Sequence, residues 1–367
     1  MTLNKINIVL LTKDINYANY FSNFMMNPNN DDKFLSKIFT DPETFKANTR
    51  NKKQHILLTD IEIPDDDILA FDRVIILSED QHTYSNESLT IYKYQPLKEL
   101  LSQVLAIYYE ANGKLNPIVN NKEKEQVVSF YSGSGGVGKT LFSLCLAKHL
   151  AIQSKRVFYL NLEELHTTNL YFKQEKPSSA EVFYYLRNNK EQLVGKIESL
   201  KSRDSLTNID YFSLPILPEE MQQSTEEDIA TLIQALRETQ NYDYIIIDLD
   251  CSIHERNVTA LGNSDEIIWL LSTDETSFTR TQNIFNNDLL DLGEDRSKIH
   301  FVLNKVSDTL FDGFNGFNFS IETHIPFNSR WLQLSEEAKM QEDTHVGEQL
   351  HKLLKEFNAT EVSILGS

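Results

Sequence analysis

The sequence predicts an α/β protein of two domains, the second built on a mostly parallel sheet flanked by helices. Three observations support this fold class. Apolar segments of strand length alternate with helix-length polar intervals in both halves of the chain, as in βαβ units. One apolar strand, 127–130, leads through a glycine-rich loop directly into a helical segment, 141–147. Residues 111–125 are polar, charged and punctuated by glycine and proline, so we expect a linker between domains 1–110 and 126–367.

Four apolar segments predict the strands of the first domain: 6–11, 56–60, 74–78 and 89–93. This domain resembles a response-regulator receiver, a flavodoxin-like fold, with Asp60 at the phospho-acceptor position and Ser78 at the end of the fourth strand. The receiver's early acidic pair is represented only by Lys13 and Asp14. Without two clustered carboxylates Mg²⁺ is held poorly. We therefore expect a degenerate receiver-like domain used for protein contact, in place of a working phospho-switch.

The second domain opens with a complete G-x-x-x-x-G-K-T motif. Its residues are Gly133, Ser134, Gly135, Gly136, Val137, Gly138, Lys139 and Thr140. The backbone N–H groups of such a loop, together with the positive end of the following helix, suit phosphate oxygens. Lys139 would reach the β- and γ-phosphates, and the Thr140 hydroxyl would ligate Mg²⁺. The motif therefore predicts nucleotide binding.

The stretch G-G-V-G-K-T resembles the signature K-G-G-V-G-K-T of the MinD/ParA ATPases, but Ser134 stands at the position of the extra lysine. In that family the signature lysine crosses a nucleotide-sandwiched dimer and contacts the partner's phosphates. The resemblance implies ATP and Mg²⁺ as ligands and a homodimer as the assembly. A serine can donate a hydrogen bond but brings no charge. We expect nucleotide binding to persist and hydrolysis to be slow or absent.

Two later strands end in residues to which the same resemblance assigns chemistry. One strand ends at Asn161 and Glu163, where the family has Asp-x-Asp, so one carboxylate is missing and the other is a methylene longer. The strand Y-D-Y-I-I-I-D ends in Asp248, which would hold the Mg²⁺ shell. Glu163 and Asp250 are the candidate catalytic residues. An alternative is that Asn161 and Glu163 only cap their strand.

Two further strands are predicted over 267–272 and 299–305. The second resembles the family strand whose asparagine pairs with the adenine edge, because the amide of Asn304 offers both a donor and an acceptor. The segment I-P-F-N that follows resembles the family segment that passes the base. Pro326 and Phe327 are therefore candidates for packing on the purine, with a plain strand-end turn as the alternative.

The domain order, a receiver-like domain before a MinD/ParA-type domain with an altered loop, resembles the TadZ/CpaE localisation ATPases. This resemblance implies a nucleotide-dependent localisation or assembly factor that works with protein partners of a pilus or secretion machine. Two alternatives remain: a DNA-partitioning ParA-type ATPase and a bacterial tyrosine-kinase-like P-loop protein. The kinase reading predicts tyrosines at the carboxyl tail, but the last tyrosine is Tyr244.

Composition bears on the partners and the location of the protein. A net charge of −19 argues against sequence-independent DNA binding, which needs a lysine- and arginine-rich face. No apolar run reaches membrane-spanning length and no signal pattern opens the chain, so we expect a cytoplasmic protein that partners recruit to the inner face of the membrane or to the cell pole. An apolar stripe predicts a carboxyl-terminal helix docked on the core: Val346, Leu350, Leu353, Leu354 and Phe357.

Overall fold

The computed structural model describes most of the chain, in two compact units, Met1–Leu115 and Asn116–Ser367. The described residues are 6–26, 34–49, 54–80, 89–97, 100–101, 103–104, 107–108, 125–172, 179–290, 292, 296–307, 311, 314–317, 319–335, 338–339 and 345–364. Apart from Glu125, the expected linker 111–125 lies outside them, as does the side chain of Phe357.

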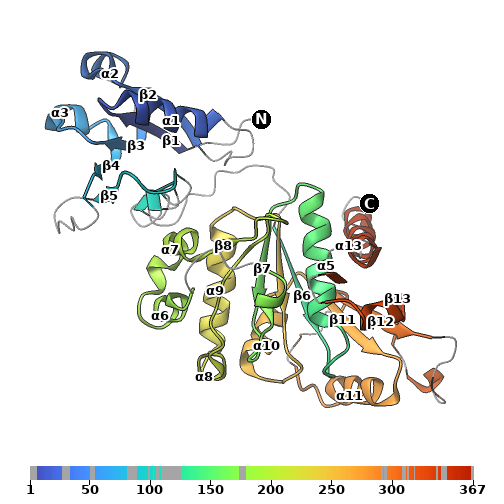
Figure 1. The fold of residues 1–367 in the computed structure, drawn as a ribbon. Coiled ribbons are helices and arrows are strands. Elements are labelled where there is room, and N and C mark those ends of the chain that lie inside the picture. The colour runs from blue at the N-terminus through green and yellow to red at the C-terminus, as the bar shows by residue number, and fades with distance from the viewer. Residues whose placement is uncertain are drawn as a thin grey trace. The chain divides into compact units, whose positions relative to one another are not determined.

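The first unit contains a five-stranded parallel sheet of order β2-β1-β3-β4-β5 (Figure 1). Its strands are β1 (Ile6–Leu11), β2 (Phe34–Phe39), β3 (Gln54–Thr59), β4 (Phe71–Ser78) and β5 (Thr90–Tyr92), and its helices include α1 (Ile15–Met26), α2 (Pro42–Thr49) and α3 (Asp65–Ile68). This strand order is that of doubly wound, flavodoxin-like folds. The sequence did not reveal β2, because this edge strand is half exposed and mixes polar with apolar residues.

The second unit contains an eight-stranded sheet of order β13-β12-β11-β6-β10-β7-β9-β8, parallel except between β8 and β9. Its strands are β6 (Gln126–Tyr131), β7 (Val157–Asn161), β8 (Ser202–Arg203), β9 (Asp210–Tyr211), β10 (Tyr244–Asp248), β11 (Glu266–Ser272), β12 (Ile299–Val306) and β13 (Ile321–Pro326). The predicted α/β class with a mostly parallel sheet is confirmed.

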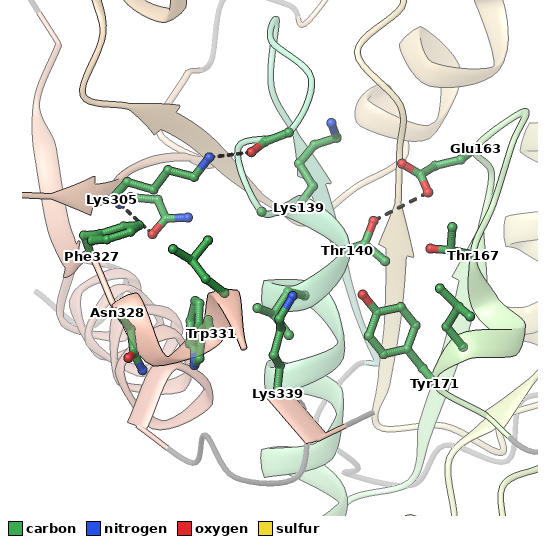
Figure 2. A pocket seen from close by; sticks show the side chains of 16 residues that line it. Lys139, Thr140, Glu163, Thr167, Tyr171, Lys305, Phe327, Asn328, Trp331 and Lys339 are labelled. Carbon is green, nitrogen blue, oxygen red and sulfur yellow. Dashed lines mark hydrogen bonds between the residues drawn. The ribbon is translucent and has the colours of Figure 1, made fainter. Parts of the chain in front are cut away.

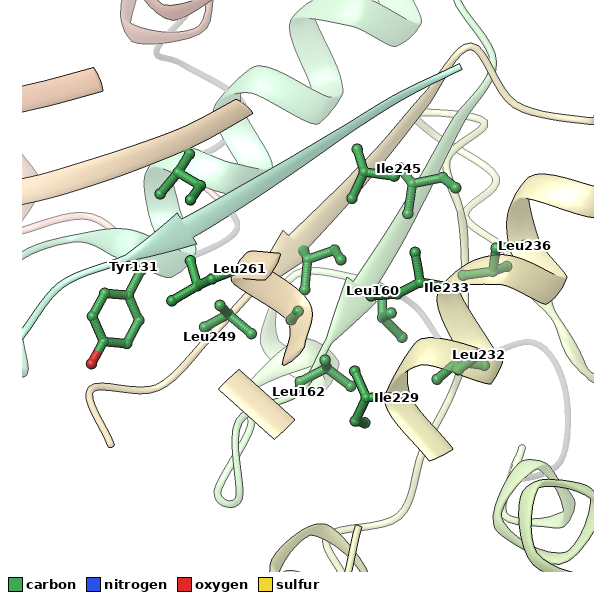
Figure 3. Close-up of a cluster of buried hydrophobic side chains, with 14 of the residues drawn as sticks. Tyr131, Leu160, Leu162, Ile229, Leu232, Ile233, Leu236, Ile245, Leu249 and Leu261 are labelled. Carbon is green, nitrogen blue, oxygen red and sulfur yellow. The ribbon is translucent and has the colours of Figure 1, made fainter. Parts of the chain in front are cut away.

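Helices cover this sheet and bury both of its faces. They are α5 (Lys139–Ile152), α6 (Glu181–Asn188), α7 (Leu193–Leu200), α8 (Pro218–Gln222), α9 (Glu226–Glu238), α10 (Glu255–Gly262), α11 (Glu275–Asn286) and α13 (His345–Ile364), with short 3₁₀ turns η1 (Thr168–Leu170), η2 (Lys190–Gln192), η3 (Phe314–Gly316) and η4 (Ser329–Leu332). Along β10, Ile245 and Ile247 pack into one apolar cluster and Ile246 into the other. Figure 3 shows part of the first cluster, where Ile245 and Leu160 lie near side chains of α9.

The predicted carboxyl-terminal helix docks on the core, as expected. Val346, Leu350, Leu353 and Leu354 of α13 are buried, and α13 lies against α5 in the second apolar cluster. The two helices approach closely at Gly347, where a β-carbon would lie 2.4 Å from the carbonyl oxygen of Cys145.

The strand register decides where the polar strand ends meet. Asp248 of β10 pairs with Phe130 of β6 on one side and with Asn161 of β7 on the other. The loop that follows β6 therefore lies beside the carboxyl ends of β7 and β10. Ligands of parallel α/β sheets bind at this edge.

Candidate functional site

The glycine-rich loop connects β6 to α5 and needs glycine at two positions. Gly136 has φ +69° and Gly138 has φ +105°, in the left-handed region that residues with a β-carbon rarely adopt. A β-carbon at Gly138 would also lie 2.8 Å from the side-chain nitrogen of Asn304. The α5 helix begins at Lys139, and no side chain caps its amino end. Its first N–H groups are therefore available to an anion.

A pocket of about 620 Å³ opens beside this loop (Figure 2). Loop and helix residues form its polar side, which includes Lys139, Thr140 and Glu163. Side chains around β13 and η4 form its other wall, with Leu170 and Tyr171 completing the lining. The full lining is Gly136, Gly138, Lys139, Thr140, Leu141, Glu163, Thr167, Leu170, Tyr171, Asn304, Lys305, Phe327, Asn328, Trp331, Leu332 and Lys339. A mixed lining of this size suits a small-molecule ligand with one charged and one apolar end.

Asp248 is fully buried beside the start of α5. One carboxylate oxygen accepts a 2.9 Å hydrogen bond from the Tyr159 hydroxyl, and the other has no hydrogen-bond partner among the described residues. Burial raises the pKa of Asp248 to about 6, although the nearby hydroxyl groups of Thr140 and Tyr159 oppose the rise. A buried carboxylate oxygen without a partner, next to a threonine hydroxyl, is a donor set that suits Mg²⁺.

Glu163 lies across from Thr140, whose hydroxyl is 3.5 Å from a Glu163 carboxylate oxygen. Burial, and then the charge of Asp248, raise the pKa of Glu163 to about 8. Asn161 accepts a 2.8 Å hydrogen bond from the Glu163 backbone N–H through its side-chain oxygen, so it fixes the turn that follows β7. The structure thus brings Thr140, Glu163 and Asp248 together at one edge of the sheet.

These residues fit a nucleotide with Mg²⁺. Lys139 and the open amino end of α5 would hold phosphates, and Thr140 and Asp248 would hold the cation. Bound Mg²⁺ would neutralise phosphate charge. The loop also leaves open space at two glycines, because nothing lies within 4 Å of a β-carbon built at Gly135 or Gly136.

Comparisons with known proteins agree with this geometry. Residues 125–288 match a family model described as an AAA domain. A ParA family ATPase from Chlorobium tepidum TLS is similar in structure, with TM-score 0.50 and 20% identity over 61% of this chain and 95% of that one. A putative plasmid partition protein from Borrelia burgdorferi B31, solved with AMPPNP, is also similar in structure, with TM-score 0.52 and 18% identity over 64% of this chain and 100% of that one. No curated protein matches the chain.

The second unit has the fold of a ParA family ATPase. The residues expected to contact the purine base lie around the other wall of the pocket. Asn304 is buried and Phe327 lines the pocket, while Pro326 ends β13 immediately before it and does not line the pocket.

Ser134 is folded inward on the loop. Its residue is 7% exposed, its backbone N–H donates to the Ser132 hydroxyl at 3.2 Å, and its own hydroxyl has no hydrogen-bond partner among the described residues. A buried hydroxyl cannot carry charge to the phosphates of a second subunit. The geometry at this position therefore differs from what a protruding lysine would supply.

Asp250 lies outside the lining of the pocket and pairs with the guanidinium of Arg256. Its other oxygen accepts hydrogen bonds from the Ser252 backbone N–H at 2.8 Å and the Asn257 amide at 2.7 Å. Burial alone would raise the pKa of Asp250, but the hydrogen bonds from Ser252 and the charge of Arg256 hold it below its ordinary value. Asp250 is thus an ionised anchor for the segment after β10.

Arg256 itself is completely buried and was missed in the sequence. It also donates to the carbonyl oxygens of Leu162, at 3.0 Å, and Met221, at 3.3 Å. Asp250, Leu162 and Met221 lie in three separate segments of the chain, so no local sequence pattern predicts these contacts. Tyr159 and Trp331 were missed for the same reason, because their roles depend on strand pairing and on the fold of η4.

The first unit holds a separate polar cluster around Lys93, which is 1% exposed. Its ammonium lies 2.9 Å from Asp60 and 3.1 Å from Asp14, and the Thr12 hydroxyl donates to Asp60 at 2.6 Å. Burial opposes the charge of Lys93, but hydrogen bonds with Asp60 and Asp14 raise its pKa above the ordinary value. The two carboxylates at the expected phospho-acceptor site therefore share a buried cation, which the sequence alone did not predict.

Across the described segments, no helix is both long and apolar enough to span a membrane. The same segments contain no cluster of three or more histidine, cysteine or acidic residues arranged to hold a metal ion. Cys145 is buried and Cys251 is exposed, and neither forms a disulfide.

Proposed function

We propose that the ParA-type unit binds ATP with Mg²⁺ and that the nucleotide sets the assembly state of the protein, with slow or absent hydrolysis. One observation carries this proposal: a single pocket joins the glycine-rich loop, the Thr140 and Glu163 side chains and the Asn304 strand end. The triphosphate would lie along the loop and the start of α5. The purine would lie toward Asn304 and Phe327.

The proposed slow turnover rests on three features of the site. Ser134 is buried and uncharged, so no loop cation would meet developing charge across a dimer. Asn161 uses its side-chain oxygen to hold the Glu163 backbone and has no carboxylate to orient a water. Glu163 stands where the resemblance has an aspartate, so its carboxylate extends one methylene farther from the strand end.

We further propose a role as a localisation or assembly factor for a pilus or secretion machine, acting as a homodimer with partners of that machine. The order of the two units supports this role, as does the first unit's strand order, which suits a receiver-like contact module. The ammonium of Lys93 already balances Asp14 and Asp60, which supports a contact role over phosphorylation of Asp60.

DNA partitioning is the second candidate, because one similar structure is that of a putative plasmid partition protein. The net charge of −19 opposes it, since binding to DNA phosphates needs a basic face. Retention of the purified protein on nonspecific DNA at low salt would favour this candidate over the assembly role.

Calorimetry with ATP and Mg²⁺ tests the nucleotide site. The wild-type protein should bind, and Lys139→Ala should lose measurable binding, because it removes the cation nearest the β- and γ-phosphates. Lys37→Ala, an exposed lysine on β2 of the first unit, is the matched control and should bind like the wild type. Unchanged affinity in Lys139→Ala would remove the site assignment.

A further inference from the structure

Strand β12 contains an irregularity at the edge of the pocket. Leu303 pairs with His324 and Val306 with Pro326, so β12 uses three residues where β13 uses two. This is a β-bulge, a device that re-aims side chains and is common beside active sites. Lys305 lies in the bulge with φ +61°. A lysine in this left-handed region carries a steric cost that a glycine would not.

The other described non-glycine residues with positive φ lie in turns or in the connections between elements; they are Ser154, Asn208, Gln240 and Asp288. Among the described residues, Lys305 is thus the non-glycine residue with positive φ that lies inside a strand. Its carbonyl oxygen also accepts a 3.2 Å hydrogen bond from the Thr273 hydroxyl, which follows β11. A strained backbone that its surroundings hold in place is a reason to look for a function.

The bulge directs two consecutive side chains onto the glycine-rich loop. The Asn304 amide nitrogen donates to the Val137 carbonyl oxygen at 2.7 Å. The Lys305 ammonium donates to the Gly136 carbonyl oxygen, also at 2.7 Å, as the dashed line in Figure 2 shows. The Asn304 side-chain oxygen in turn accepts from the Lys305 backbone N–H at 2.7 Å. Two consecutive carbonyl groups of the loop therefore accept hydrogen bonds from side chains at the same strand end.

Holding these carbonyl groups fixes the N–H groups on the other side of the same peptides. A trans peptide is planar, and its C=O and N–H bonds point in opposite directions. The Gly136 carbonyl shares its peptide with the Val137 N–H, and the Val137 carbonyl shares its peptide with the Gly138 N–H. A donor bound to each oxygen also polarises the peptide, which makes its N–H a stronger donor.

We propose that Lys305, together with Asn304, is a positioning residue for the phosphate cradle. Lys305 orients and polarises the Val137 N–H through the Gly136 carbonyl, and its left-handed backbone forms part of the bulge that allows both contacts. The inference rests on the proposed function, since the ligand of the cradle is the phosphate chain of ATP. It assigns to an exposed lysine an effect on binding that acts through the backbone of the loop.

Two substitutions separate this role from a merely structural one. Lys305→Gly removes the ammonium and relieves the positive-φ strain, so its melting temperature should equal or exceed that of the wild type while its affinity for ATP with Mg²⁺ falls about five- to tenfold. Lys305→Arg keeps a cationic donor at the same position and should bind within about twofold of the wild type. Calorimetry and thermal unfolding of the full chain measure both quantities.

Unchanged affinity in Lys305→Gly, or equal weakening in Lys305→Gly and Lys305→Arg, would overturn the positioning role and leave the proposed function standing. Failure of the wild-type protein to bind ATP would overturn the proposed function and the positioning role with it. Weak binding accompanied by a lowered melting temperature in Lys305→Gly would also count against the proposal, because it would mean that Lys305 stabilises the fold.

Discussion

The affinity for ATP with Mg²⁺ should rise with pH, because Mg²⁺ held by Thr140 and Asp248 would lie beside Glu163, and both buried carboxyl groups would lose their protons when the cation binds. Burial and the charge of Asp248 raise the pKa of Glu163 to about 8, and burial raises that of Asp248 to about 6. Cations bind ionised carboxylates, so protons compete with Mg²⁺. At pH 7 only about one tenth of Glu163 is ionised.

The expected change in affinity follows from the loss of one proton, that of Glu163, when the nucleotide and the cation bind. The ionised fraction of Glu163 falls about fivefold from pH 8 to pH 7 and about tenfold from pH 7 to pH 6, so the affinity should fall about fiftyfold. Below pH 6 the slope should steepen as Asp248 takes up a second proton. Calorimetric titrations at pH 6, 7 and 8, at constant ionic strength, measure the change.

Glu163→Gln is the control, because it removes this titration and leaves that of the nucleotide's own phosphates. The variant should show a much flatter profile between pH 7 and pH 8. Equal slopes in the variant and the wild type would refute the assignment of the linked proton to Glu163.

The same two carboxyl groups should also make the free energy of unfolding of the unliganded protein depend on pH. Their folded pKa values lie above the unfolded values of about 4.3 for Glu163 and about 3.9 for Asp248. The folded state therefore holds these two protons more tightly than the unfolded state does. The stability that the two groups contribute is lost as pH rises through about 6 and about 8. The free energy of unfolding of Glu163→Gln should depend less on pH over this window.

Two further predictions concern stability. His300 is buried between Glu266 and Glu322. Burial disfavours its charged form, but hydrogen bonds with these carboxylates raise its pKa to about 9. The charged form therefore contributes about 3 kcal/mol to the free energy of unfolding, which is fully present below about pH 6.5 and is lost as pH rises through about 9. Urea unfolding at pH 7 and pH 9.5 should show this loss, and an equal loss in His300→Gln would contradict it. Arg256→Met should destabilise the protein by about 3–5 kcal/mol, because it leaves the Asp250 carboxylate unpaired, and adding Asp250→Asn should recover part of that; a single-variant effect below about 1 kcal/mol would argue against the anchor.

Features encoded by contiguous residues were predictable from the sequence. The glycine-rich loop was found because its chemistry fixes residue types at fixed spacing, and both of its left-handed positions carry glycine. The strand before Asp248 was found because a strand buried on both faces reads as an unbroken apolar run. The docked helix α13 followed from its apolar stripe.

Features that depend on tertiary pairing were not predictable. Tyr159 reads as a core residue of β7, and only the strand pairing brings its hydroxyl to Asp248. Lys305 carries no sign of a left-handed conformation, since the bulge arises from its register with β13. Lys93 finds Asp14 and Asp60 across three strand ends, and β8 and β9, of two residues each, are too short to give a periodic signal.

The central claim is that nucleotide binding sets assembly while turnover stays slow. Its most direct test measures phosphate release and molar mass by light scattering on one sample of the wild-type chain, with ATP and Mg²⁺. The mass should rise from that of one 42.4 kDa chain to that of two, while phosphate release stays far below the roughly per-second rates of ordinary enzymes. The double variant Ser134→Lys, Asn161→Asp should release phosphate faster. Wild-type turnover at per-second rates, unaffected by Glu163→Ala and Asp250→Ala, would contradict the account.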